Sequence, residues 1–161
     1  MHKTYYKSPI GYAEITASGD AIVSVNVLDR APKKSLQSAD AQVPILKKCM
    51  QELDEYFRGE RQHFSVKLER QEGTDFQQKV WKALEKISFG KTSSYLDVAQ
   101  KIGNAKAVRA VGAANGKNPH WIIVPCHRVI GKNKKLVGYS SGLWRKEWLL
   151  DHEKKFLGAQ A

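Results

Sequence analysis

Two helix-start signatures in the second half of the chain constrain its fold more than any other feature. Thr74 is followed at the third position by Gln77, a spacing that lets each side chain accept a hydrogen bond from the other residue's backbone N–H. Ser94 and Asp97 repeat this spacing further along the chain. Apolar residues at helical intervals follow both signatures, so we expect two helices, the first ending near residues 89–90.

A segment of small residues follows the second helix. A tight turn at Gly103 and Asn104 leads into residues 105–115, which we expect to form another helix ended by Gly116. Two short helices joined by a glycine turn are typical of a helix-turn-helix that enters a DNA groove, although a plain helical hairpin has the same pattern. Arg109 could push into a duplex or bind phosphate, with a surface salt bridge as the alternative.

The first half of the chain has a different periodicity. Val23, Val25 and Val27 alternate with polar residues, which is typical of a half-buried strand. We expect strands at 12–17 and 21–28, a helix at 44–58 and a final short strand at 64–68. Cys49 lies in the apolar stripe of that helix and should pack in the core. Residues 69–73 are polar, so we expect one domain over 1–70 and a second over 71–161.

The positive charge is concentrated in the second half. The net charge is +11; residues 1–70 contribute +2 and residues 71–161 contribute +9. This asymmetry favours a polyanionic partner for the second half, with nucleic acid ahead of an anionic membrane surface, and a basic surface kept for solubility as the alternative. Two cysteines make no disulfide framework, and no apolar run could span a bilayer, so we expect a cytoplasmic protein.

Cys126 lies in the most unusual local context of the chain. The apolar run 122–124 leads to Pro125, then to the thiol, and then to His127 and Arg128. A thiol reacts as its thiolate, which neighbouring cations and proton acceptors favour, and His127 and Arg128 could supply both. The alternative is that Cys126 is a small core residue.

The last part of the chain predicts a loop and a helix. Lys132–Lys135 should form a basic turn, and residues 137–142 a flexible loop. A helix should begin near Leu143, and its apolar residues that we expect in the core are Trp144, Trp148 and Leu149. Glu153 on this helix could orient a histidine, with a solvated carboxylate as the alternative.

Several motifs together carry a resemblance to a known family. They are Pro125-Cys126-His127-Arg128-Val129, Arg109-Ala110-Val111-Gly112, Asn118-Pro119, Tyr139-Ser140-x-Gly142-Leu143 and Lys146-x-Trp148-Leu149-Leu150-x-His152-Glu153. The chain resembles the O6-alkylguanine-DNA alkyltransferases over about residues 76–153; the first half resembles them in length and element order. The resemblance implies an α+β protein, with a ribonuclease H-like domain followed by a winged helix-turn-helix domain.

The resemblance also implies an activity. The family flips an O6-alkylated guanine out of the duplex and moves the alkyl group irreversibly onto its own cysteine, once per molecule. Cys126 would be the nucleophile, His127 would take its proton through a water, and Glu153 would hold the imidazole. Tyr95 would donate a hydrogen bond to the departing guanine, with the Ser140 backbone amide as a second donor.

Further residues follow from the same resemblance. The DNA-binding residues would be Arg109, Ala110, Gly112, Ser94, Lys106 and Asn115. The substrate pocket would hold Val129, Ser140, Tyr139 and Asn118, where Asn118 ties the recognition helix to the cysteine segment. We expect no cofactor, no metal and no membrane, but a monomer acting on double-stranded DNA that carries O6-alkylguanine. Ser141 and the pair His120-Trp121 depart from the family pattern beside the expected pocket.

Other functions stay open at this point. A protein that binds the lesion without reacting would share the helix-turn-helix, but it would not need Cys126. A cysteine hydrolase would use Cys126 and His127, although neighbours on an extended chain point in opposite directions. A winged-helix regulator leaves the Pro-Cys-His motif unexplained. Repair of O4-alkylthymine and cooperative binding on DNA are also undecided.

Overall fold

The computed structural model of the protein describes residues 1–32, 39–70, 72–132 and 139–158. The chain divides into two compact units, one holding Met1–Gln71 with Pro119–Trp121 and the other Glu72–Asn118 with Ile122–Ala159. The expected α+β class is confirmed, because strands dominate the first unit and helices the second. Across the residues described, each helix is too short or too polar to cross a bilayer.

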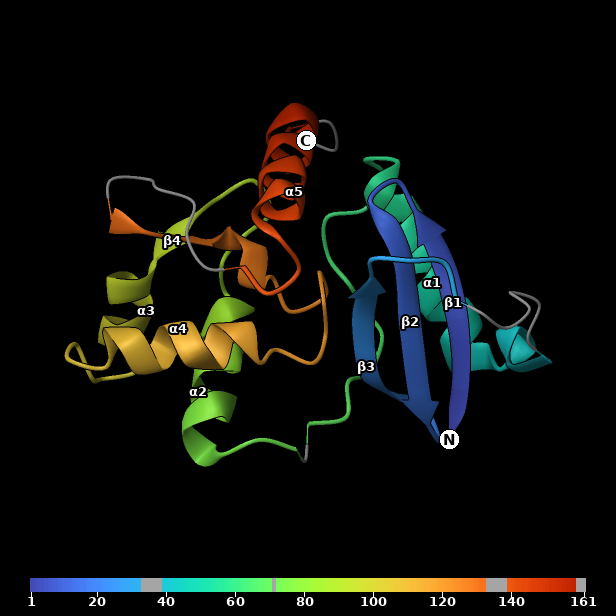
Figure 1. Cartoon of the computed structure of the whole chain (residues 1–161), viewed down its shortest axis with the longest axis horizontal. Helices are drawn as coiled ribbons and strands as arrows, with labels where there is room; N and C mark the ends of the chain where they lie inside the picture. Colours follow the sequence, from blue (N-terminus) through green and yellow to red (C-terminus); the bar gives the residue numbers. More distant parts are fainter. Residues whose placement is uncertain (33–38, 71, 133–138, 159–161) are drawn as a thin grey trace. The chain divides into compact units, whose positions relative to one another are not determined.

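The first unit is built on a three-stranded antiparallel sheet in the order β1-β2-β3 (Figure 1). The strands are β1 (His2–Ser8), β2 (Gly11–Ser18) and β3 (Ala21–Leu28), so both strands expected from the sequence are confirmed. Gly19 takes a φ of 61° in the turn between β2 and β3, a conformation that glycine adopts without steric strain. Ala13, Ile15 and Ala17 are fully buried at alternate positions of β2, which defines the core face.

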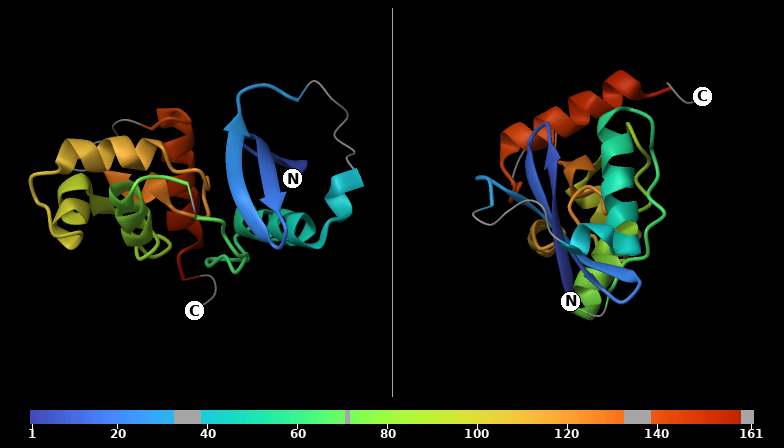
Figure 2. Two further views of the ribbon diagram at one scale, coloured as in Figure 1. Left: turned by 90° about the horizontal axis from the view of Figure 1, so that it is seen from below. Right: turned by 90° about the vertical axis from the view of Figure 1, so that its right-hand side faces the viewer.

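Helix α1 (Pro44–Phe57) lies against one face of this sheet, as Figure 2 shows. Pro44 occupies the first turn, where its missing N–H costs no hydrogen bond. A short 3-10 helix, η1 (Ala39–Gln42), precedes it. The α1 residues with no exposed surface are Leu46, Cys49, Leu53 and Tyr56. Cys49 is thus a core residue, as expected.

The strand expected at 64–68 is not present. Glu52 is buried on α1, and its carboxylate accepts hydrogen bonds from the backbone N–H groups of Ser65 (2.8 Å) and Val66 (3.3 Å). A single bridge joins Leu68 to Ile22 of β3. The alternating sequence pattern of this segment arises because the Val66 side chain is buried. The Glu52 carboxylate accepts the backbone N–H groups that a partner strand would otherwise bind.

Both capping boxes in the second unit are confirmed. Helix α2 (Asp75–Leu84) begins at Thr74, whose side chain accepts from the Gln77 N–H at 3.1 Å. Helix α3 (Tyr95–Lys101) begins at Ser94, which accepts from the Asp97 N–H at 3.0 Å. Helix α4 (Val108–Gly116) packs against α2 and α3 (Figure 1), giving the expected helix-turn-helix pair.

Two expected helix boundaries are wrong. Helix α2 ends at Leu84 and not near residues 89–90. After Leu84 the backbone changes to hydrogen bonds of the 3-10 type, in which the Ile87 N–H donates to the Leu84 carbonyl three residues back. Ile87 is still buried, which explains its place in the apolar pattern. Helix α4 begins at Val108 and not at Ala105, since residues 105–106 form a turn.

The rest of the second unit brings the cysteine segment against the last helix. Strands β4 (Ser93–Ser94) and β5 (Val129–Ile130) pair in parallel, and the 3-10 helix η2 (Cys126–Arg128) leads directly into β5. Helix α5 (Leu143–Phe156) contacts η2. The expected basic turn Lys132–Lys135 lies largely outside the described residues, as do residues 137–138 of the expected loop. The rest of that loop, 139–142, has no helix or strand and forms a turn at residues 140–141.

Candidate active site

Cys126 lies at the start of η2 and is 6% exposed. A 3.9 Å hydrogen bond joins its Sγ to Tyr139 Oη, and its carbonyl accepts from Asn115 Nδ2 at 3.3 Å. Burial raises the pKa of the Cys126 thiol, while Asn118, Tyr139 and Lys146 act in the lowering direction. The folded protein therefore holds Cys126 as a thiol that is surrounded by groups able to stabilise a thiolate.

The segment before Cys126 is a turn and not an extended strand. Ile122 has a φ of 70°, the only positive value for a residue other than glycine in the described chain, and its side chain is buried. Asn118 Nδ2 donates to the Val124 carbonyl at 2.7 Å and closes the turn. Cys126 and His127 therefore do not lie on an extended chain, and the expectation that strand geometry separates their side chains is wrong. No direct hydrogen bond joins them in the residues described, however.

His127 is fully buried and is held by Glu153. Its Nε2 lies 2.6 Å from Glu153 Oε2, whereas its Nδ1 has no partner among the described residues. Burial lowers the pKa of His127, and the opposing influence of Glu153 does not reverse this shift, so the imidazole is neutral. A neutral ring that donates from Nε2 to a carboxylate has its lone pair on Nδ1. The arrangement leaves one buried proton acceptor beside Cys126.

Glu153 is the centre of the polar network. Its Oε1 accepts from Arg128 Nε at 2.8 Å and from the Gly90 N–H at 3.1 Å, and its Oε2 also accepts from Arg128 Nη2 at 3.0 Å. Burial acts to raise the pKa of Glu153, but His127 and Arg128 outweigh it and hold this pKa well below its usual range. Glu153 is therefore ionised, and Arg128 balances its charge.

Lys146 was not identified from the sequence as a site residue, although it belongs to one of the quoted motifs. It is fully buried on α5, and its Nζ lies 5.7 Å from the ring centroids of both Tyr95 and Tyr139. Burial lowers the pKa of Lys146 to about 8, against an opposing effect of Cys126. The signal in the sequence is the spacing of Lys146, Leu149 and Glu153, which places them on one helix face.

Arg128 has a different role from the one expected. Its guanidinium points to Glu153 and to the Ile87 carbonyl, which it contacts through Nη1 at 2.6 Å. The cation that acts on Cys126 is Lys146. Arg128 is thus close to Cys126 in the sequence, but its guanidinium binds other groups, and the cation that acts on the thiol comes from a different helix.

The residues expected to bind DNA divide into three groups. Arg109 and Ala110 are exposed in the first turn of α4, and Lys106 is exposed in the turn before it. Ser94 caps α3, and Gly112 faces Tyr95, where an added Cβ would meet the ring only at 3.9 Å. Asn115 is buried and bonded to the Cys126 carbonyl, so its expected place on a DNA-facing surface is wrong.

Only some of the residues expected in the substrate pocket contact Cys126 or the segment before it. Tyr139 contacts Cys126, Val129 is buried in β5, and Asn118 holds the turn before Cys126. Tyr95 is half-buried at the start of α3, and burial together with Cys126 raises its pKa. Ser140 is exposed.

The departures from the family pattern are also placed. Ser141 uses its carbonyl to accept from Arg145 Nη1 at 2.9 Å. His120 and Trp121 are buried within the first unit, where His120 Nε2 lies 2.9 Å from the Ile22 carbonyl and the Trp121 ring packs near Phe57. Their side chains are therefore engaged in that unit's own core.

The expected burial of the apolar residues Trp144, Trp148 and Leu149 on α5 is only partly confirmed. Leu149 is fully buried and Trp148 is half-buried, but Trp144 is 54% exposed and stacks with Arg145. Among the described residues, no three His, Cys, Asp or Glu side chains gather closely enough to hold a metal ion.

Comparisons with known proteins agree on one family. Residues 1–70 match the family described as 6-O-methylguanine DNA methyltransferase, ribonuclease-like domain, and residues 75–155 match its DNA binding domain. A methylated-DNA–protein-cysteine methyltransferase of Methanosarcina acetivorans is 45% identical over 156 residues, covering 95% of this chain and 98% of the relative. The relative of the same name from Haemophilus influenzae is 41% identical, covering 96% and 87%. The crystal structure of Mycobacterium tuberculosis OGT in complex with DNA is similar with a TM-score of 0.87 and 42% identity, covering 97% of this chain and 94% of that one.

Proposed function

We propose that this chain, which belongs to the 6-O-methylguanine DNA methyltransferase family, repairs DNA by moving the alkyl group from O6 of an alkylated guanine onto its own Cys126. The observation that carries the proposal is the buried thiol beside a neutral imidazole whose Nδ1 is unpartnered in the described residues. A nucleophile, a nearby base and a carboxylate that orients the base make up a general activation triad.

Activation begins with a proton transfer. Cys126 is a thiol at rest because burial raises its pKa, and His127 is a free base because burial lowers its pKa. The thiol proton passes through one water molecule to His127 Nδ1, and the imidazolium that forms donates from Nε2 to Glu153. Glu153 is already ionised, so the new ion pair needs no second proton transfer.

Lys146 stabilises the thiolate once it has formed. Its ammonium group is buried beside Tyr139, which itself contacts Cys126 Sγ. A positive charge in a water-poor site acts on a neighbouring anion far more strongly than it would in water. At neutral pH most Lys146 side chains are charged, since the pKa is about 8.

Group transfer then proceeds by a displacement. The thiolate sulfur attacks the alkyl carbon, a new S–C bond forms, and the C–O6 bond breaks with its electron pair left on the guanine. Tyr95 Oη and the Ser140 backbone N–H donate hydrogen bonds to the departing base, which afterwards takes a proton from solvent. The product thioether has no good leaving group, so each molecule reacts once.

The helix-turn-helix presents the substrate. Arg109 is exposed at the start of α4, where it fills the space that the flipped nucleotide vacates in the stack, and Ala110 allows a close approach to the groove. Lys106 contacts phosphate. Asn115 and Asn118 fix the backbone of the cysteine segment relative to α4, through the Cys126 and Val124 carbonyls.

Mass spectrometry of the purified protein after mixing with a duplex that carries one O6-methylguanine tests the proposal. We expect one methyl group on the Cys126 peptide, saturating at one per molecule, and none on Cys49, whose pKa burial raises to about 12. Cys126→Ser should bind the duplex and stay unmodified. A wild-type protein that binds the lesion without gaining a methyl group would be a binding module. Repeated turnover without an adduct would indicate a hydrolase instead.

A further inference from the structure

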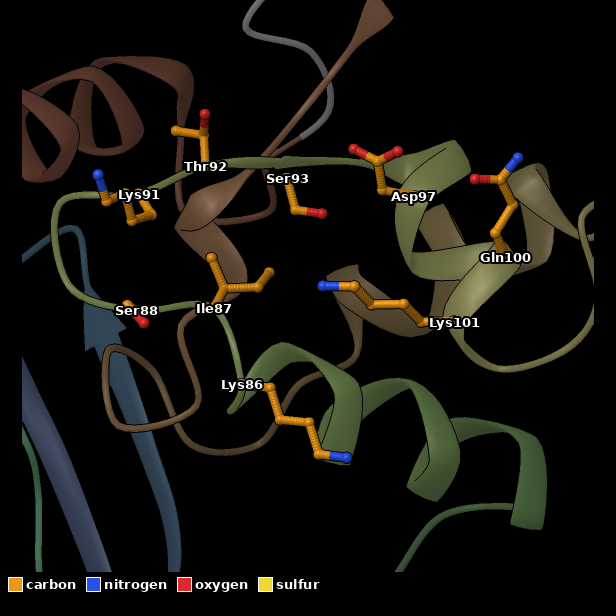
Figure 3. A pocket seen from close by; sticks show the side chains of 9 residues that line it. All are labelled: Lys86, Ile87, Ser88, Lys91, Thr92, Ser93, Asp97, Gln100 and Lys101. Carbon is orange, nitrogen blue, oxygen red and sulfur yellow. The ribbon is translucent and has the colours of Figure 1, made fainter.

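A basic cleft of about 550 Å³ opens in the second unit between the end of α2, the connection to β4, and α3 (Figure 3). Lys86, Lys91 and Lys101 line it, together with the hydroxyl groups of Ser88 and Thr92. In Figure 3 the Lys101 side chain extends across the opening, with Lys91 on the other side. No residue of α4 lines this cleft, so it is separate from the recognition helix.

The charge of this cleft is unbalanced. None of its three lysines makes an ion pair within the part of the chain that the structure describes. Asp97 is the only acidic residue lining the cleft among the described residues, and its carboxylate accepts the Ser94 N–H at 3.2 Å as part of the α3 cap. The cleft therefore has three ammonium groups against one carboxylate, together with hydroxyl donors, and keeps an excess of positive charge.

A second cleft of about 360 Å³ continues the first. It shares Lys86 and Lys101 and adds Lys79 and Lys82 from α2. Lys79 and Lys82 are three residues apart on α2, so like charges lie close together on one side of this helix, an unfavourable arrangement, and Lys86 follows two residues after the helix ends. We call the five residues Lys79, Lys82, Lys86, Lys91 and Lys101 the lysine channel.

We propose that the lysine channel binds the sugar–phosphate backbone of nucleic acid at a site distinct from the one on α4. Lysines act as point charges that match repeated phosphates, and the hydroxyl groups can donate to phosphate oxygens. No aromatic residue lines either cleft in the described chain, so the channel has no platform on which a base or a free nucleotide could stack. A phosphodiester chain fits this surface, which extends over two clefts that share Lys86 and Lys101.

The salt dependence of binding tests the channel. The double variant Lys86→Gln with Lys101→Gln removes the two lysines common to both clefts; all four side chains changed here and in the control are exposed, so the fold is preserved. The matched control is Lys47→Gln with Lys48→Gln on α1 of the first unit. Each phosphate contact contributes about 0.9 to the slope of log affinity against log salt for a duplex, so the channel variant should flatten the slope by about 1.8.

That slope change is large enough to measure. Between about 50 and about 200 mM salt, wild-type protein should lose about 12-fold more affinity for a lesion-free duplex than the channel variant does. The control should run parallel to wild type. Parallel lines for wild type and the channel variant would overturn the proposal, and so would an equal flattening in the control.

A second measurement identifies the source of the phosphates. Labelled lesion-free single strand is added to protein already saturated with a lesion duplex. Capture of the strand by wild type and not by the channel variant assigns the channel to a separate nucleic acid. A flattened duplex slope without such capture assigns it to the backbone that flanks the lesion. Wild type and the channel variant should transfer the alkyl group equally well from a duplex of about one helical turn. Loss of transfer in the variant alone would contradict a site distinct from the one on α4. Absence of transfer in wild type would contradict the proposed function and not the channel.

Discussion

Glu153→Gln should be among the most damaging conservative substitutions in the second unit. The Glu153 carboxylate accepts from Gly90, His127 and twice from Arg128. An amide of the same shape keeps one acceptor oxygen and turns an N–H₂ group toward groups that are themselves donors. It also leaves the buried Arg128 side chain, which is 8% exposed, without its counter-charge.

The expected size of the effect follows from that buried charge. Removing one partner of a buried ion pair typically costs about 3 to 5 kcal/mol. The entropy of unfolding is about 2.1 cal/mol/K per residue, which for a chain of 161 residues is about 0.34 kcal/mol/K. The melting temperature should therefore fall by about 9 to 15 °C for a single cooperative transition.

The pH dependence of stability gives an independent readout. The folded-state pKa of Glu153 lies below its unfolded value of about 4.3. A depressed carboxyl pKa contributes stability that is fully present above the unfolded pKa and is lost as the pH falls toward the folded pKa. Wild-type stability should therefore decline below about pH 4.3 more steeply than the stability of Glu153→Gln.

Thermal unfolding followed by circular dichroism, at neutral and acid pH, measures both effects. Glu147→Gln is the matched control, because Glu147 is exposed on the same helix, and it should change the melting temperature by little. Combining Glu153→Gln with Arg128→Met should cost at least about 1 kcal/mol less than the sum of the two single changes. A drop of less than about 3 °C for Glu153→Gln, or strict additivity in the pair, would refute the reasoning.

Three further results are expected. Lys146→Met removes the cation near Cys126, so the thiol pKa should rise and alkylation by iodoacetamide at neutral pH should slow about tenfold per unit of pKa; an unchanged pH profile would exclude this role. Arg109→Ala should weaken transfer from a duplex much more than transfer from the free modified base, and equal losses would show that it takes no part in flipping. Cys126→Ser should abolish transfer while retaining affinity for the lesion duplex in a gel-shift assay.

The sequence predicted a structural feature correctly where that feature depends on residues only a few positions apart in the chain. The capping boxes at Thr74 and Ser94 involve residues three positions apart, so the starts of α2 and α3 were predictable. The strands around Gly19 depend on an alternating pattern and a turn residue, and they too were predictable. The burial of Cys49 was predictable from its position in the apolar stripe of a helix.

The errors arise where a distant residue decides the outcome. Residues 64–68 have a strand pattern, but the carboxylate of Glu52 on α1 accepts the N–H groups of Ser65 and Val66. Asn115 belongs to a helix expected to face DNA, yet the Cys126 carbonyl holds its side chain inside. Lys146 gains its importance only when α5 places it beside two tyrosines from other segments.

The enclosure of Cys126 also determines the fate of the protein after it has reacted. A thiol that is 6% exposed sits in a packed segment, and an added methyl group there is an overpacking change that typically costs about 1 to 3 kcal/mol. The unfolded fraction would then rise by about 5-fold to about 140-fold, since about 1.4 kcal/mol is a factor of ten. Proteases act on the unfolded population, so a cell could remove spent molecules without recognising the thioether. Repair capacity would then equal the number of unmodified, folded molecules, and resynthesis would set its recovery.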